Sequence, residues 1–192
     1  MAEPENQGSF WTVDAWLRHE QTSEVRHELV DGELLTRAGG SEAHALLGGD
    51  VYLLLGLALR GRPCRVIGPD LLVRVGDDTA FYPDVQVRCP DGEGQPTVVV
   101  EVLSDSTEAW DRGGKFERYR RLPHLRHYVL VAQDRVLVEH FRWNADGSWT
   151  YTPLGPGAVL VLGELASLPV DEIYARVNVG GPPSRLPAQT QA

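Results

Sequence analysis

Two carboxylates of this chain, one inside a short apolar segment and one next to another, are candidates for chemistry. Glu101 lies inside the run Val98–Leu103, which is rich in β-branched residues and is typical of a buried strand. An ionised carboxylate taken out of water is costly unless a cation or a metal compensates it. Asp84 opens a second short strand-like segment, Val85–Arg88, and the loop between the two segments is rich in Gly, Pro and Asp. The spacing therefore predicts two paired strands, with their carboxylates facing each other at one edge of a sheet.

The third residue suited to chemistry is Lys115. Of the 18 basic residues in the chain, 17 are arginine and Lys115 is the only lysine. Such a bias usually reflects genomic base composition, which replaces lysine by arginine wherever either residue serves. Arginine is planar and permanently charged, whereas lysine is a compact point charge whose pKa shifts readily. Retention of lysine here favours a chemical role, although a single lysine can also survive by chance.

Length and composition fit one compact domain. With 42% hydrophobic residues the chain can bury a substantial core, which we expect over residues 10–178, between disordered ends at 1–9 and 179–192. No apolar run approaches about 18 residues, and the first residues lack the segments of a signal peptide. We therefore expect no membrane span and a cytoplasmic protein. Cys64 and Cys89 fit no metal spacing, and we expect two buried free thiols.

The hydrophobic pattern predicts strands and helices in alternation. Thr12 and Ser41 are suited to cap helices, and Asp31-Gly32 predicts a hairpin turn because both turn positions need positive φ. A long helix from about residue 42 to 60 should pack on the sheet through one apolar face. Helices are expected over 13–19, 42–60, 107–122 and 171–176, and strands over 25–30, 33–37, 64–67, 70–75, 85–88, 98–103, 127–132, 136–143 and 149–153.

The order and spacing of several motifs are specific, although each motif alone is loose. The motifs are Glu28–Glu33, a helical His44, Pro83-Asp84-Val85, Val100–Ser104, and Asp111–Pro123 followed by Tyr128–Val131. Together they resemble the Uma-two family of predicted endonucleases, placed in the PD-(D/E)xK nuclease superfamily, over roughly residues 10–178. The resemblance implies a mixed α/β, restriction-endonuclease-like fold, with a mixed central sheet flanked by helices. It also implies a divalent metal held by the aspartate and the glutamate.

The position of the lysine departs from the usual superfamily pattern. In the common arrangement the lysine lies two residues after the glutamate, where this chain has Leu103. In the Uma-two pattern it lies on the following helix, and Lys115 occupies that place. A helix that returns over the end of the strand can bring a long side chain to the same point in space. The resemblance thus implies the catalytic set Asp84, Glu101 and Lys115.

Phosphodiester cleavage needs an activated water and relief of the charge that develops at phosphorus. Mg²⁺ prefers octahedral oxygen ligation through one or two carboxylates, with water and substrate phosphate completing the shell, and Mn²⁺ is an alternative. Lys115 would orient or help deprotonate the water and neutralise negative charge. The expected metal ligands are Asp84, Glu101 and the backbone carbonyl of Val102, and the auxiliary candidates are Glu28 and His44.

The charge distribution bears on the substrate. A net charge of −9 argues against wide non-specific binding of nucleic acid, but residues 112–126 carry six basic side chains. This stretch could approach a phosphate backbone, and a solvated helix face is the alternative. We expect a nucleic-acid substrate, DNA rather than RNA, and a homodimer. The candidates for phosphate contact are Arg112, Arg118 and Arg121.

A purely structural interpretation stays open for each residue. Asp84 could be a turn residue, Glu101 a buried partner of Lys115, and Lys115 a helix residue four positions after Asp111. The rival function is therefore a catalytically inactive binding or assembly module with the same fold. Other chemistries are disfavoured, because the chain lacks a Gly-x-Ser-x-Gly elbow, a complete phosphate-binding loop and a third ligand to join His124 and His127 on zinc.

Overall fold

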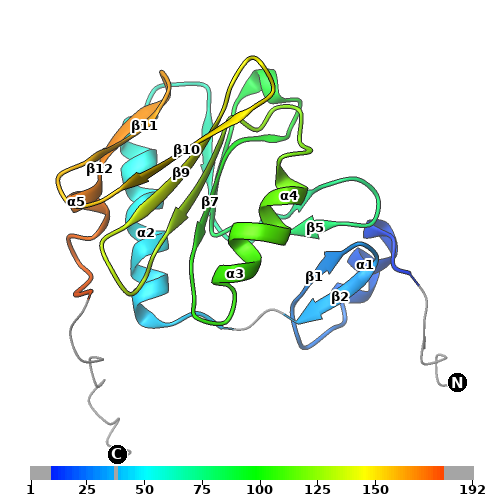
Figure 1. The fold of residues 1–192 in the computed structure, drawn as a ribbon. Helices are drawn as coiled ribbons and strands as arrows, with labels where there is room; N and C mark the ends of the chain where they lie inside the picture. Colours follow the sequence, from blue (N-terminus) through cyan, green and yellow to red (C-terminus); the bar gives the residue numbers. More distant parts are fainter. Residues whose placement is uncertain (1–9, 37–38, 180–192) are drawn as a thin grey trace, which may run out of the picture.

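A six-stranded mixed sheet forms the centre of the molecule (Figure 1). The computed structural model describes residues 10–36 and 39–179, so the predicted ends lie outside the described residues, apart from residue 179. The strand order is β10-β9-β8-β7-β6-β3, and only β7 and β8 run parallel. The bounds are β3 Arg65–Ile67, β6 Val85–Arg88, β7 Pro96–Val102, β8 His127–Val131, β9 Val138–Trp143 and β10 Trp149–Leu154.

Helices cover both faces of this sheet, which confirms the predicted mixed fold. On β7, Val98, Val100 and Val102 pack in one hydrophobic cluster with the long helix α2, while Val99 and Leu103, the residue after the strand, pack in a second cluster on the other face. Glu101 therefore points to the face opposite α2. The α2 face is completed by a hairpin that the sequence did not predict. These elements are α2 Glu42–Ala58, β11 Val159–Leu162, β12 Ala166–Pro169 and α5 Val170–Ile173.

A second, four-stranded sheet lies beside the central one, in the order β2-β1-β5-β4 (Figure 1). Its hairpin turns at Asp31 and Gly32, whose φ values of 48° and 81° confirm the predicted turn. The first helix packs against it through Val13 and Trp16. The elements are α1 Val13–Glu20, β1 His27–Val30, β2 Glu33–Thr36, β4 Val73–Arg74 and β5 Ala80–Phe81. Among the described helices none is long and apolar enough to cross a membrane.

The helix after β7 differs from the regular helix predicted over 107–122. It comprises α3 (Glu108–Trp110), a π-helical turn at Asp111–Lys115, and α4 (Phe116–Tyr119). A Cβ atom on Gly114 would lie 1.9 Å from the Trp110 ring, so only glycine permits this close packing. The π turn buries both of its end residues, the aspartate and the lysine. Such turns frequently occur at functional sites.

The prediction of two free thiols is wrong, because Cys64 and Cys89 form a disulfide. The cause is the pairing of β3 with β6, in which Arg65 lies opposite Arg88. One step outward in this antiparallel register places the two cysteines across from each other, with their Cα atoms 4.2 Å apart. The pairing joins segments 25 residues apart, and the cysteine spacing alone gave no sign of it.

We expect the disulfide to add roughly 3 kcal/mol to the free energy of unfolding, as the closure of a loop of this length predicts. Urea unfolding of the oxidised protein, the protein with dithiothreitol, and the Cys64→Ser/Cys89→Ser variant measures this. The two latter samples should agree with each other and unfold at lower urea. Detection of two free thiols in unreduced, denatured protein would contradict the pairing.

A buried histidine pair links β8 to β9. The Nδ1 atom of His127 lies 2.9 Å from Nε2 of His140, and the two rings are stacked at an interplanar angle of 28°. Burial lowers the pKa of each imidazole to about 4, and neighbouring positive charge acts in the same direction: that of His140 and then Arg142 on His127, and that of Arg142 on His140. Both rings are therefore neutral in the folded protein near pH 7.

The histidine pair should make the protein less stable in mild acid. Between about pH 6.5 and 4 the histidines of the unfolded chain bind protons, whereas the buried pair of the folded protein does not. The free energy of unfolding is therefore highest above this window and falls as the pH drops through it. We expect a loss of about 3 kcal/mol for each histidine, and about half of the total loss for His140→Gln, measured by urea unfolding. An unchanged pH slope in this variant would refute the assignment.

Candidate active site

Lys115 lies at the centre of a cluster of carboxylates. Its Nζ atom is 3.0 Å from Oε1 of Glu101, 3.3 Å from Oε1 of Glu28 and 3.8 Å from Oδ1 of Asp111. The strand β7 supplies Glu101, β1 supplies Glu28, and the π turn supplies both of its own end residues. All four side chains are buried. The structure thus brings Glu101, Lys115 and the auxiliary candidate Glu28 together.

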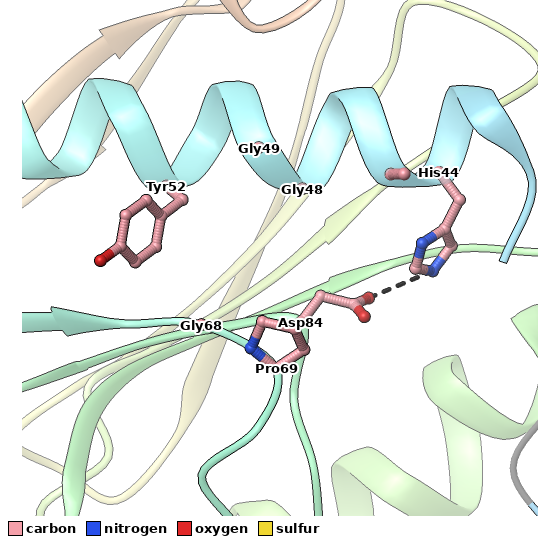
Figure 2. A pocket seen from close by; sticks show the side chains of 8 residues that line it. His44, Gly48, Gly49, Tyr52, Gly68, Pro69 and Asp84 are labelled. Atoms are coloured by element: carbon pink, nitrogen blue, oxygen red, sulfur yellow. Dashed lines mark ion pairs between the residues drawn. The ribbon is translucent and has the colours of Figure 1, made fainter. Parts of the chain in front are cut away.

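Asp84 joins the cluster from the start of β6. The register pairs Val85 with Val100, so Asp84 comes next to Glu101, and its Oδ2 atom accepts a hydrogen bond of 2.8 Å from the Val102 backbone N–H. Nε2 of His44 lies 3.3 Å from the same oxygen, across the gap between α2 and the sheet (Figure 2). The predicted neighbourhood of the two carboxylates is therefore present, and both auxiliary candidates contact the predicted residues.

The pKa values of the two carboxylates move in opposite directions. Burial raises the pKa of the Asp84 carboxyl, but the hydrogen bond and charge of His44 and the Val102 N–H outweigh it, and the net shift is downward. Burial raises the pKa of Glu101 to about 8, although the charge of Lys115 opposes this. The hydroxyl of Tyr119 donates a 3.0 Å hydrogen bond to Glu101. Asp84 is thus ionised at neutral pH, whereas Glu101 lacks enough positive charge around it.

Lys115 keeps its proton in this environment. Burial lowers the pKa of its ammonium, but the negative charges of Glu101, Glu28 and Asp111 outweigh burial, so the net pKa is raised. Four carboxylates, counting Asp84, then share one lysine and one histidine. The negative charges therefore outnumber the positive charges, and a divalent cation bound here would neutralise the excess.

The donor set fits a hard cation better than zinc. Within the parts of the chain that the structure describes, no group of three or more His, Cys, Asp or Glu side chains is placed to hold a metal. Zinc sites use three or four such ligands, whereas Mg²⁺ is commonly held by one or two carboxylates and keeps several waters. Asp84 and Glu101 supply two carboxylates beside a cavity of about 930 Å³, which is large enough for water and substrate. These residues therefore fit Mg²⁺ or Mn²⁺.

The cavity is a cleft, here called the acidic cleft, that runs from the carboxylate cluster to the surface. Its deep end holds the three predicted catalytic residues, and its outer walls come from the start of α2 and the loop after β7. Other lining residues include Arg26, Ser41, Ser104, Thr107, Trp110 and Gln133.

The arginines predicted to contact phosphate are engaged within the protein. Arg112 contacts Glu139 at 2.8 Å and Glu108 at 2.6 Å. Arg118 pairs with Asp31 and lies over the Trp110 ring, 5.1 Å from its centroid. Arg121 is more exposed and lies 3.8 Å from Glu117. Their role toward nucleic acid stays a prediction.

Sequence reasoning missed two members of the cluster. It considered the spacing of Asp111 and Lys115 only as a structural alternative and gave Tyr119 no role at the site, whereas the first contacts Lys115 and the second donates to Glu101. Their positions, four residues before and four after the lysine, were the available signal, since such residues share one helix face. The π turn modifies that geometry and could not be read from the spacing.

Residues 13–171 match the model of the Uma2 family, described as "Putative restriction endonuclease". The chain belongs to this family. Among its relatives are two from Synechocystis sp. (strain ATCC 27184 / PCC 6803 / Kazusa): "Uncharacterized protein slr1290" is 33% identical, covering 84% of this chain and 90% of that protein, and "Uncharacterized protein sll1609" is 29% identical, covering 74% and 86%.

The Uma2 chain also shares its fold with a solved structure, the crystal structure of "a putative nuclease belonging to DUF820" from Anabaena variabilis ATCC 29413. The TM-score is 0.72 at 15% sequence identity, covering 86% of this chain and 98% of that one. The predicted family and the predicted nuclease-like fold are therefore confirmed.

We expect Lys115→Met to lower the free energy of unfolding by about 3–5 kcal/mol, because it leaves buried carboxylates without their cation. Adding Glu101→Gln should recover part of this loss, since a neutral amide needs no counter-charge. Urea unfolding of both single variants, the double variant and the wild type in EDTA buffer measures the coupling. Simple additivity of the two changes would contradict a direct ion pair.

Proposed function

We propose that this Uma2 protein is a metal-dependent endonuclease that hydrolyses phosphodiester bonds of nucleic acid, DNA rather than RNA. The observation that carries the proposal is the convergence of Asp84, Glu101 and Lys115 at the deep end of the acidic cleft. The family description, which names restriction endonucleases, supports DNA as the substrate.

Asp84 and Glu101 would hold the metal ion, with the backbone carbonyl of Val102 as a candidate third ligand. When bound, Mg²⁺ or Mn²⁺ would supply Lewis-acid stabilisation of the phosphate and a more acidic water. The raised pKa of Glu101, about 8, is consistent with a carboxylate that lacks a cation. His44 would hold Asp84 in place through the contact at Oδ2.

Lys115 would act as a charged hydrogen-bond donor. Three carboxylates keep its ammonium protonated, so it is poorly suited to accept a proton from water. A fixed positive charge at this point can orient the attacking water and stabilise the charge that develops on the phosphate oxygens. Glu28 and Asp111 would fix the position of the ammonium through their contacts with Nζ.

One observation favours the alternative of an inactive binding or assembly module. Lys115 and the Tyr119 hydroxyl already contact Glu101, so the cluster is satisfied in part without a metal. In that case Asp84 and Glu101 would matter to stability alone, and Mg²⁺ would leave the melting temperature unchanged.

The test is cleavage of plasmid, single-stranded DNA and RNA with Mg²⁺ or Mn²⁺ and with EDTA. We expect cutting that needs metal and falls by at least about a hundredfold in Glu101→Gln and Lys115→Arg, because each loses an interaction with the transition state. Glu172→Gln, an exposed carboxylate on α5, is the matched control and should cut as the wild type does.

Thermal unfolding with and without Mg²⁺ separates the two functions. In the nuclease, Mg²⁺ should raise the melting temperature of the wild type and of Glu172→Gln but not of Glu101→Gln. Absence of cutting on every substrate, together with no metal-dependent shift, would refute the nuclease and leave the binding module.

A further inference from the structure

A second cavity, here called the α2 hollow, lies next to the acidic cleft. It has a volume of about 420 Å³, within the size range of small-molecule sites. One wall is a face of α2, and the opposite wall is formed by the turn after β3 and the start of β6 (Figure 2). Its lining residues are His44, Ala45, Gly48, Gly49, Tyr52, Gly68, Pro69 and Asp84.

The shape of the hollow follows from the spacing of residues on α2. His44, Gly48 and Tyr52 are four residues apart and therefore form one stripe along the helix. The histidine contacts Asp84 at one end, the tyrosine stands at the other, and glycine leaves the space between them open (Figure 2). At 1.5 Å per residue, the two ends are about 12 Å apart.

Packing does not explain the glycine at position 49. A Cβ atom there would meet nothing within 4 Å, and its φ is not in the positive region. Glycine inside a helix costs about 1 kcal/mol relative to alanine. A side chain at position 49 would enter open space on the side of α2 that lines the hollow.

We propose that the α2 hollow binds an unstacked nucleobase of a nucleotide next to the scissile phosphate. This proposal rests on the proposed nuclease function. The hollow and the acidic cleft share His44 and Asp84, so a phosphate held at the cluster has a neighbouring base within reach of the hollow. Tyr52, 46% exposed, offers an aromatic ring for stacking, and glycines leave room for a flat ring.

The charges of the molecule support a binding mode that depends on bases. The net charge is −9, and Arg112, Arg118 and the cleft-lining Arg26 are held in ion pairs. Contact with many phosphates is therefore weakly supported, and stacking can supply the missing affinity without reading sequence. A base inside a duplex is stacked and paired, so the substrate must be single-stranded or locally unpaired.

Gly49→Leu tests the hollow with little risk to the fold, since its Cβ has free space. Gly56→Leu is the matched control, because Gly56 lies on the same helix, is exposed, has equal free space and does not line the hollow. Tyr52→Ala removes the ring, and Tyr52→Phe keeps it.

Binding is measured by fluorescence anisotropy of a labelled single-stranded DNA oligonucleotide with Ca²⁺, and cleavage of the same strand with Mg²⁺. Gly49→Leu and Tyr52→Ala should weaken binding by about tenfold, as the loss of one stacked base predicts, with a parallel loss of cleavage. Gly56→Leu should behave as the wild type does, and Tyr52→Phe should bind and cut better than Tyr52→Ala because it keeps the ring. An abasic strand should bind equally weakly to every variant.

Three results would overturn the proposal. In the first, Gly49→Leu binds and cuts as Gly56→Leu does. In the second, the wild type cuts a fully paired duplex as fast as a single strand. Either result would leave the nuclease function in place. Alternatively, the wild type could neither bind nor cut any nucleic acid. That result removes the proposed function and this subsite with it.

Discussion

The buried pair of Glu101 and Lys115 is the constraint on which the rest of the site depends. Two charges removed from water are tolerated only with close geometry and further polar partners. The fold supplies these partners from distant parts of the chain: β1 brings Glu28, while the π turn and α4 bring Asp111 and the Tyr119 hydroxyl. The second sheet and the interrupted helix can therefore be understood as the supports that hold one ammonium at the end of β7.

The charges of this arrangement are poorly balanced. Glu101 has a pKa near 8 because one lysine does not offset burial and three further carboxylates. In a cluster that served stability alone, positive and negative charges would be equal in number, or apolar side chains would replace them. Apolar replacements of a buried ion pair often leave the protein at least as stable. The surplus of negative charge supports the proposal that Asp84 and Glu101 hold a metal ion. The same surplus makes the ammonium a fixed charge, which suits charge stabilisation at phosphate more than proton transfer.

The sequence predicted what depends on neighbouring residues. The Asp31-Gly32 turn, the long helix and the strands around Asp84 and Glu101 follow from local patterns, and the family motifs placed Lys115 beside them. The disulfide, by contrast, depends on the register between β3 and β6. The β11–β12 hairpin depends on its packing against the face of the central sheet that α2 also covers. The π turn depends on the packing of Gly114 against a ring. Such features arise from tertiary contact and leave little trace in local periodicity.

In the proposed function, glycines on α2 would connect the site to its substrate. The helix packs on the sheet through residues such as Leu47 and Val51, so its core face needs no glycine. Gly48 and Gly49 leave the face beside Asp84 without side chains. An acidic protein with paired arginines cannot rely on a long track of phosphate contacts. Recognition would then be short and local, with one phosphate at the carboxylate cluster and one base against Tyr52. In this arrangement the charged cluster would act at the phosphate that is cut, and the apolar surface of the α2 hollow would hold the strand.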